Sequence, residues 1–305
     1  MRPKPLDGVY GRPPAELASV PPDAIQLSPL VPLSRALEGE GDDTFGSLTM
    51  LAPAGVLERR YAVAHALRIL APAGKLRVLA PKDKGGARLA RELADFGCTI
   101  SESARRHHRI CSAVRPVQPV GLAEAIAAGG AQVPAALGLW SQPGIFSWDR
   151  PDPGSLALIR HLPPLVGAGA DFGCGIGLLA RAILAGQDVT ALTLIDIDRR
   201  AVAASRRNVE DARATFVWDD IRRTELPLRN LDFVVMNPPF HDGGLEDRAL
   251  GVAFIARAAG ALRPGGVCWL VANRHLPYEA ALRSHFAVAR QVEQGDGYKI
   301  YEARR

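Results

Sequence analysis

The sequence predicts an α/β protein whose carboxyl-terminal half forms a Rossmann-like, doubly wound, mostly parallel sheet. From residue 168 onward, short apolar runs typical of buried strands alternate with segments of helical spacing. A glycine-rich turn, Gly173-Cys174-Gly175-Ile176-Gly177, joins the first of these strands to a helix. A helix-Pro-Gly-strand pattern occurs in both halves of the chain. This repetition predicts a smaller, degenerate α/β domain ahead of the main sheet.

The composition is that of a globular protein. The chain has 305 residues, 48% hydrophobic and 23% charged, and its length suits one large domain or two modest ones. No apolar run reaches the length of a membrane span, and Met1-Arg2-Pro3-Lys4-Pro5 lacks the apolar core of a signal peptide. Four scattered cysteines without a Cys-x-x-Cys pair argue against disulfides and metal. We therefore expect a cytoplasmic protein, and its net charge of +5 permits nucleic-acid binding.

The first domain is expected to span residues 1–135 and the second residues 136–305. Residues 1–45 are rich in proline and predict an extended segment with room for a strand. Helical spacing follows over residues 57–70, then a strand over 75–80 and a second helix over 85–96. A linker rich in Gly, Ala and Pro is expected between residues 127 and 142.

A weak internal repeat relates the two halves. Four residues of the first half match four of the second at one constant offset: Leu70, Pro72, Gly74 and Ala80 with Leu262, Pro264, Gly266 and Ala272. We interpret this as a duplication whose first copy lost its ligand loop, because no Asp-x-Gly-x-Gly-x-Gly and no Asn-Pro-Pro occurs before residue 135. The alternative is chance similarity between two helix-Pro-Gly-strand units.

The glycine loop and the acids after the next two strands predict a nucleoside-containing cofactor. Asp171 precedes the loop, and its alternating glycines allow a tight turn close to a ligand. Asp196 ends the strand over residues 191–196, where an acid can accept hydrogen bonds from ribose hydroxyls. The strand over residues 215–221 ends in Asp219 and Asp220, either of which could accept from an adenine amino group. Dinucleotide sites share the first two features.

Asn237-Pro238-Pro239-Phe240 directly follows the apolar run over residues 231–236. The prolines end that strand at the edge of the sheet where α/β proteins bind ligands. The Asn237 amide oxygen and the Pro238 carbonyl are two acceptors, and Phe240 adds a flat face. Together they suit a planar group with an exocyclic NH2, such as a nucleobase. The alternative is an ordinary turn after a strand.

This order of motifs resembles the class I S-adenosylmethionine-dependent methyltransferases of the Asn-Pro-Pro-Phe/Tyr kind. Within them, the chain resembles the bacterial ribosomal RNA small-subunit guanine-N2 methyltransferases. The supporting segments are Pro143–Asp149, Asp152–Ser155, Asn237–His241 and Ala272–Tyr278. The resemblance implies S-adenosyl-L-methionine as cofactor, ribosomal RNA or the small subunit as partner, and an inactive, here shortened, methyltransferase-like domain at the amino terminus. We expect a monomer that needs no metal and no membrane.

The resemblance also implies roles for individual residues. Asn237 and Pro238 would hold the guanine amino group, and Phe240 would stack on the base. The cofactor residues would be Asp171, Gly173, Gly175 and Gly177 around the methionine part, Asp196 at the ribose, Asp220 or its competitor Asp219 at the adenine, and Phe146, Asp152 and Ser155 closing over the cofactor. For Phe146, simple core packing is the alternative.

Two other functions fit parts of the pattern. Protein-glutamine and adenine-N6 methyltransferases use the same Asn-Pro-Pro geometry. A noncatalytic RNA-binding protein could keep the fold, although intact cofactor and Asn-Pro-Pro motifs argue against it.

Overall fold

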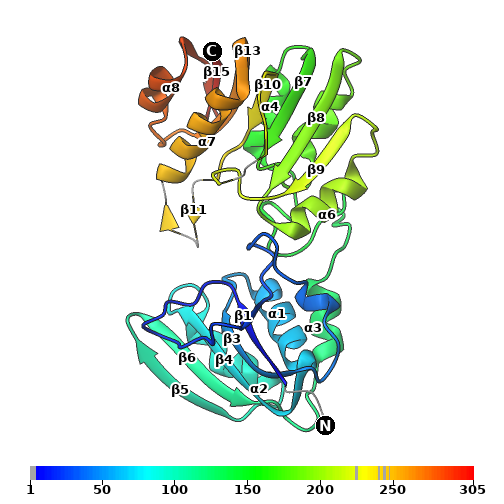
Figure 1. The fold of residues 1–305 in the computed structure, drawn as a ribbon, viewed down its shortest axis with the longest axis vertical. Helices are drawn as coiled ribbons and strands as arrows, with labels where there is room; N and C mark the ends of the chain where they lie inside the picture. The colour runs from blue at the N-terminus through cyan, green and yellow to red at the C-terminus, as the bar shows by residue number, and fades with distance from the viewer. Residues whose placement is uncertain (1–4, 224–225, 240, 243–244, 247) are drawn as a thin grey trace. The chain divides into compact units, whose positions relative to one another are not determined.

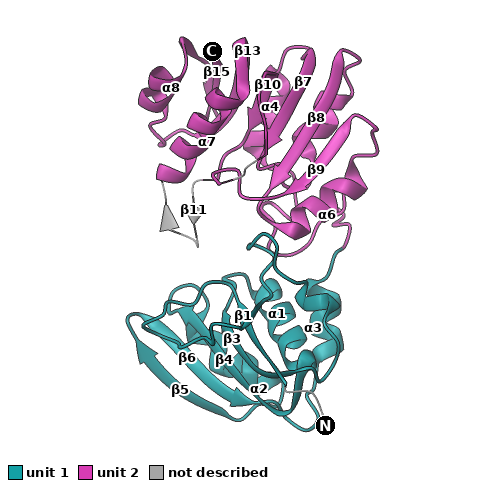
Figure 2. Ribbon diagram, in the orientation of Figure 1, with its two compact units in different colours: residues 1–131 teal, residues 132–305 magenta. Residues whose placement is uncertain are grey.

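The computed structural model describes residues 5–305 except 224–225, 240, 243–244 and 247. The chain divides into two compact units, residues 1–131 and residues 132–305 (Figure 2). Each unit has its own sheet and its own buried core (Figure 1). None of the helices in the described part of the chain is long and apolar enough to cross a membrane.

The first unit is built on a six-stranded sheet in the order β2-β1-β3-β4-β6-β5. Its elements are β1 (Leu6–Tyr10), β2 (Ile25–Gln26), η1 (Leu37–Gly39), β3 (Phe45–Leu51), α1 (Val56–Ile69), β4 (Leu70–Pro81), η2 (Gly86–Arg88), α2 (Leu89–Asp95), β5 (Ile100–Arg105), β6 (His108–Val114) and α3 (Leu122–Gly129). Strands β1 to β4 are parallel, whereas β6 and β5 are antiparallel additions. The proline-rich start of the chain therefore supplies an internal strand, β1, which its short apolar run did not reveal.

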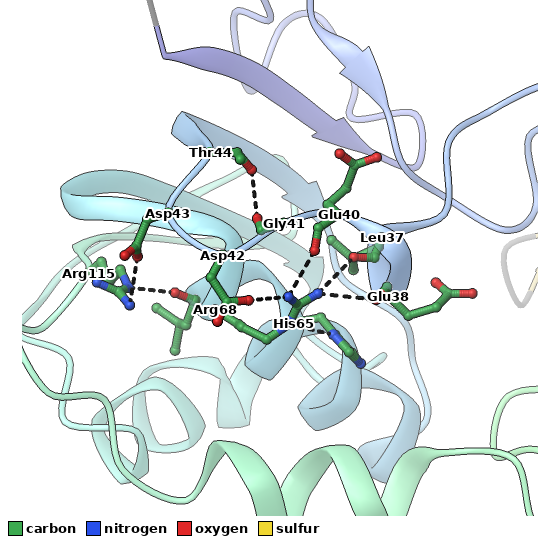
Figure 3. A network of polar contacts seen from close by, with 11 residues as sticks. Leu37, Glu38, Glu40, Gly41, Asp42, Asp43, Thr44, His65, Arg68 and Arg115 are labelled. Atoms are coloured by element: carbon green, nitrogen blue, oxygen red, sulfur yellow. Dashed lines mark hydrogen bonds and ion pairs between the residues drawn. The ribbon is translucent and has the colours of Figure 1, made fainter. Parts of the chain in front are cut away.

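Arginine side chains tie the end of α1 to the loop between η1 and β3 (Figure 3). Arg68 donates to the backbone carbonyl of Glu40 at 2.9 Å and pairs with the Asp42 carboxylate. Arg115 donates to the Leu67 carbonyl at 2.7 Å and pairs with Asp43 at 3.1 Å. Cations at a helix carboxyl terminus satisfy carbonyls that the helix itself leaves without donors. This network therefore fixes how α1 leads into β4.

The second unit is built on a seven-stranded sheet in the order β14-β15-β13-β10-β7-β8-β9. Its elements are α4 (Pro153–His161), β7 (Gly167–Phe172), α5 (Leu178–Leu184), β8 (Val189–Asp196), α6 (Arg199–Asn208), β9 (Ala214–Trp218), β10 (Leu231–Met236), β11 (His241–Asp242), β12 (Leu245–Glu246), α7 (Arg248–Ala261), β13 (Leu262–Asn273), α8 (Glu279–His285), β14 (Val288–Gly295) and β15 (Tyr298–Arg304). Strands β9, β8, β7, β10 and β13 are parallel, and β15 and β14 are antiparallel at one end.

Alternate residues of the central strand β10 pack against helices on opposite faces of this sheet. Val234 and Met236 belong to the core under α7 and α8, whereas Phe233 and Val235 belong to the core under α4 and α5. This two-period alternation with apolar residues on both faces is what a buried parallel strand requires. The doubly wound fold predicted from the sequence is thus confirmed.

Two element ends differ from the expectation. Helix α3 continues to Gly129, so the first residues of the predicted linker of residues 127–142 are helical, while the boundary between the two units, after Ala131, lies inside that linker. Strand β9 ends at Trp218, so Asp219 and Asp220 lie in the segment after the strand rather than within it. In both cases apolar spacing located the element but not its end, because ends depend on tertiary contacts.

Candidate active site

A pocket lies at the carboxyl ends of β7 and β10 in the second unit. In open α/β sheets this edge is where ligands bind. The pocket is lined by Phe146, Ser147, Arg150, Pro151, Asp152, Ser155, Gly173, Cys174, Gly175, Ile176, Leu178, Leu179 and Asn237. The glycine loop, the segment before α4 and Asn237 therefore meet at one place.

The loop from Gly173 to Gly177 needs glycine for two separate reasons. A Cβ on Gly177, whose φ is +87°, would lie 2.8 Å from Val209 Cγ2. Gly175 has a φ of +53°, and a Cβ built on it would meet nothing within 4 Å. Because Gly175 lines the pocket, a side chain there would project into open space that a ligand can use. The loop therefore provides a cradle of backbone atoms.

Asp196 holds this loop in place from the end of β8. One carboxylate oxygen accepts from the Gly175 N–H at 2.8 Å, and the other accepts from the Asp198 N–H at 2.8 Å. Burial raises the pKa of Asp196 to about 6. Asp196 is not among the residues that line the pocket. Its contacts add a loop-anchoring role to the ribose contact expected from the sequence.

Asp171 lies at the end of β7 with 0% of its surface exposed. Neither of its carboxylate oxygens has a hydrogen-bond partner. Burial, reinforced by the charge of Asp196, raises its pKa to about 8. A buried carboxylate without a donor is suited to a cationic ligand nearby, because a positive charge offsets the cost of ionising it. S-adenosylmethionine, the cofactor that the resemblance implies, would carry such charge on its sulfonium and ammonium groups.

Asn237 is oriented by the first turn of α4. Its Nδ2 donates to Asp152 Oδ2 at 2.8 Å and to Ser155 Oγ at 3.0 Å. Since a carboxylate only accepts, the amide nitrogen and not the amide oxygen must face Asp152. The side-chain amide oxygen of Asn237, Oδ1, is consequently turned away from α4. Pro238, the next residue, is buried.

The two acids after β9 differ in their partners. Both oxygens of Asp220 accept from the Arg222 guanidinium, at 2.8 and 2.7 Å. Burial raises the pKa of Asp220, but the hydrogen bonds and charge of Arg222 outweigh it, so the net shift is downward. Asp219 is half-buried and accepts from the Asp220 N–H at 2.8 Å. An adenine amino group would have to share the Asp220 oxygens with Arg222.

The expected site residues divide into two groups. Phe146, Ser155, Gly173, Gly175 and Asn237 line the pocket, whereas Asp171, Gly177, Asp196, Asp219, Asp220 and Pro238 do not. Phe146 is 60% exposed, so the alternative of simple core packing is wrong. Phe240 lies outside the described residues.

Asn208 is a structural support that sequence reasoning missed. Its side chain exchanges hydrogen bonds with the backbone of Trp140, at 2.8 and 2.9 Å, and donates to the Ile176 carbonyl at 2.9 Å. The Arg207 guanidinium lies 4.5 Å from the centre of the Trp140 ring. These contacts join the segment before α4 to the glycine loop. No motif marks Asn208, because its partners are backbone atoms distant in sequence.

Within the described residues, no group of three or more His, Cys, Asp or Glu side chains could hold a metal ion.

Comparison with known proteins assigns the chain to a family. Residues 136–302 match the family described as the methyltransferase small domain. Ribosomal RNA small subunit methyltransferase C of Pseudomonas paraeruginosa is 34% identical over 242 residues, covering 77% of this chain and 72% of the relative. The protein of the same name from Shewanella loihica is 30% identical over 271 residues, covering 86% and 78%. The chain belongs to the ribosomal RNA small subunit methyltransferase C family. It is an S-adenosylmethionine-dependent methyltransferase.

A solved structure shares the fold over the whole chain. It is the T. thermophilus 16S rRNA N2 G1207 methyltransferase in complex with AdoMet and guanosine, with a TM-score of 0.80 at 22% identity, covering 100% of this chain and 89% of that one. The two-part architecture, a small α/β unit ahead of the methyltransferase sheet, is thus confirmed as the fold of this family.

Proposed function

We propose that this chain transfers a methyl group from S-adenosylmethionine to the exocyclic N2 of a guanine in small-subunit ribosomal RNA. The observation that carries the proposal is the fixed amide of Asn237, whose nitrogen is held by α4 and whose oxygen is turned away. An oxygen acceptor beside the pocket suits an NH2 substrate. The names of the relatives and the guanosine complex of the solved neighbour support the RNA and the base.

The protein's contribution is orientation and electrostatics, because the cofactor supplies the activated methyl group when bound. The lone pair of the guanine amino group is delocalised into the ring. The Asn237 oxygen and the Pro238 carbonyl would each accept one of its hydrogens, which aims the nitrogen at the methyl group. Phe240 would stack on the base, and base–aromatic stacking contributes roughly 1–3 kcal/mol. A paired guanine must be flipped out, or be single-stranded already.

For cofactor binding we propose the residues expected from the sequence. The glycine loop and Asp171 would surround the methionine part, and Asp196 would accept from the ribose while it anchors Gly175. Asp219 and Asp220 are the candidates at the adenine. Phe146 and Ser155 line the pocket and would cover the cofactor.

Transfer of labelled methyl to ribosomal subunits and to total RNA from a strain lacking the gene tests the proposal, with nucleoside analysis of the product. Labelled N2-methylguanosine is the expected result. Label only in N6-methyladenosine would keep the enzyme class and overturn the base. Label only in protein would favour glutamine as the substrate.

Gly175→Arg tests the placement of the cofactor. A long side chain from this position would enter the pocket, because nothing lies within 4 Å of the added Cβ. We expect loss of S-adenosylmethionine binding in calorimetry, with RNA binding unchanged. Cofactor binding of normal affinity would move the cofactor away from this loop.

We further propose that the protein acts in the cytoplasm as a monomer. Light scattering of the purified chain measures its oligomeric state.

A further inference from the structure

The side chain that orients Asn237 is itself held rigidly. Asp152 is the N-cap of α4, and its Oδ2 accepts from the Ser155 N–H at 2.7 Å as well as from Asn237. Pro153 occupies the start of the helix, where its fixed φ stabilises the first turn. Asp152 and Ser155 are each 7% exposed. The acceptors of the Asn237 amide therefore belong to a capped, buried helix start and not to a loop.

Packing against the last strand holds this helix start in position. A Cβ on Gly154 would lie 2.7 Å from Cε1 of Tyr298, the first residue of β15. The glycine thus lets the first turn of α4 approach the ring closely. Burial of Tyr298 raises the pKa of its hydroxyl, and the negative charge of Asp152 adds to the rise. The N-cap hydrogen bond and the close packing of Gly154 against Tyr298 therefore limit the movement of the helix start that carries Asp152.

We propose that Asp152 is a positioning residue for methyl transfer, which acts by fixing the Asn237 amide with its oxygen toward the acceptor amine. If the amide were reversed, it would present its own NH2 to the substrate NH2, and neither group could accept. The carboxylate of Asp152 prevents that reversal because it has no hydrogen to donate. The arrangement selects methyl-accepting groups that carry N–H hydrogens, because the amide oxygen of Asn237 can accept only from such a donor. This inference rests on the proposed function and specifies how the site orients its substrate.

Asp152→Ser is the decisive variant, because serine remains a good N-cap while its shorter side chain withdraws from Asn237. We expect kcat to fall about 10- to 100-fold, as for a reacting group displaced by about 1 Å. The affinity for S-adenosylmethionine, measured by calorimetry, should fall less than kcat, although Asp152 lines the pocket, and the melting temperature should stay close to that of the wild type. Asp152→Asn should retain most of the activity, because the Ser155 N–H would hold its amide oxygen at the place of Oδ2, facing Asn237. Asp149→Ser is the matched control, since Asp149 lies in the same segment but does not line the pocket.

Three results would overturn the inference. They are an unchanged kcat in Asp152→Ser, a loss of cofactor affinity as large as the loss of kcat, and an Asp152→Asn variant as impaired as the serine variant. The variants are assayed on whichever amine the wild-type protein methylates. Label in another nucleoside would thus overturn the N2 assignment, while the activity of each variant relative to wild type would still decide the role of Asp152.

Discussion

The two units of this protein share one strand order, yet only the second carries the candidate site. Starting from the edge of each sheet where the strands are parallel, the order is β2-β1-β3-β4-β6-β5 in the first unit and β8-β7-β10-β13-β15-β14 in the second. The second sheet has one more strand, β9, beyond β8. Even an irregularity recurs, since the register shift between Phe45 and Ser47 against β4 matches that between Leu231 and Phe233 against β13. The helices before these strands, α1 and α7, are both 14 residues long. The agreement in register supports a duplication more strongly than the four matching residues do.

The first difference lies after β1, the counterpart of β7. In register with β3 and β10, Val9 stands at the place of Asp171, and Pro13 therefore at the place of Gly175. Gly11 keeps a positive φ of +77°, so the turn out of the strand survives. Proline at the ligand-facing position removes an N–H and the space that glycine leaves open. The first unit has thus kept the turn and lost the cradle.

The second difference lies after β3, the counterpart of β10. Leu51 stands at the place of Asn237. The Arg59 guanidinium donates to the carbonyls of Pro53 and Ala54, at 3.0 and 2.7 Å, and forms a two-pronged pair with Glu92 at 2.7 Å. Arg59 is 0% exposed. Two backbone carbonyls of the segment after β3 are therefore occupied by the protein's own guanidinium, and Leu51 offers no side-chain amide at the position of Asn237.

The largest effect is expected from breaking that internal pair. Arg59→Ala leaves the Glu92 carboxylate buried without its partner, which costs about 3–5 kcal/mol. Urea denaturation of the full chain should show the first unit unfolding early, with cofactor binding by the second unit retained. Arg60→Ala is the control, because its pair with Asp95 is exposed and contributes little. A cost below about 1 kcal/mol would show that the buried Arg59–Glu92 pair does not stabilise the first unit.

Asn237→Ala and Leu51→Ala compare the two strand ends directly. The first should reduce kcat about 10²- to 10³-fold, the range seen when one preorganised polar contact to the reacting group is lost. Cofactor affinity should change little. The second should leave methyl transfer unaltered, because Leu51 only packs in the first unit. Normal turnover by Asn237→Ala would remove the basis for the substrate clamp.

A smaller difference concerns pH, since only the second unit buries an aspartate beside its glycine turn. The pKa of Asp171 is raised from its ordinary value to about 8, so the folded state binds a proton that the unfolded chain releases near pH 4. The contribution of Asp171 to the free energy of unfolding is fully present below about pH 4 and is lost as the pH rises through about 8. The loss is up to about 1.4 kcal/mol for each pH unit. The melting temperature of the second unit, measured without cofactor, should therefore fall as the pH is raised from about 4 to about 8. Asp171→Asn should flatten the fall, and an equal slope in the variant would refute the assignment.

The smallest effects are expected at the acids after β9, which the first unit lacks along with the strand. Asp219→Asn and Asp220→Asn should each weaken cofactor affinity, by about tenfold where the carboxylate binds the adenine amino group (roughly 1.4 kcal/mol). The variant with the greater loss identifies the adenine ligand. Equal affinity in both variants and the wild type would place the adenine elsewhere. Calorimetric titration with S-adenosylmethionine is the measurement.

The sequence by itself determined the fold class, the glycine loop and the two strand-end motifs. These features are local: apolar runs of period two specify buried strands, and glycine or proline at fixed spacing specifies turns. The helix predicted over residues 57–70 matches α1 to within one residue at each end, and the strand predicted over residues 75–80 lies inside β4. The chain's length and motif order were enough to separate a degenerate from an intact half.

Only the tertiary structure decided which atoms face the site. Asp152 lies far from Asn237 along the chain, and Arg59 far from Glu92, so neither pairing leaves a spacing signal. The strand at the start of the chain became visible only through its partners in the sheet. Hydrogen-bond direction is set by geometry in space: a buried carboxylate fixes an amide, and a buried guanidinium fills a strand end, wherever folding brings them together.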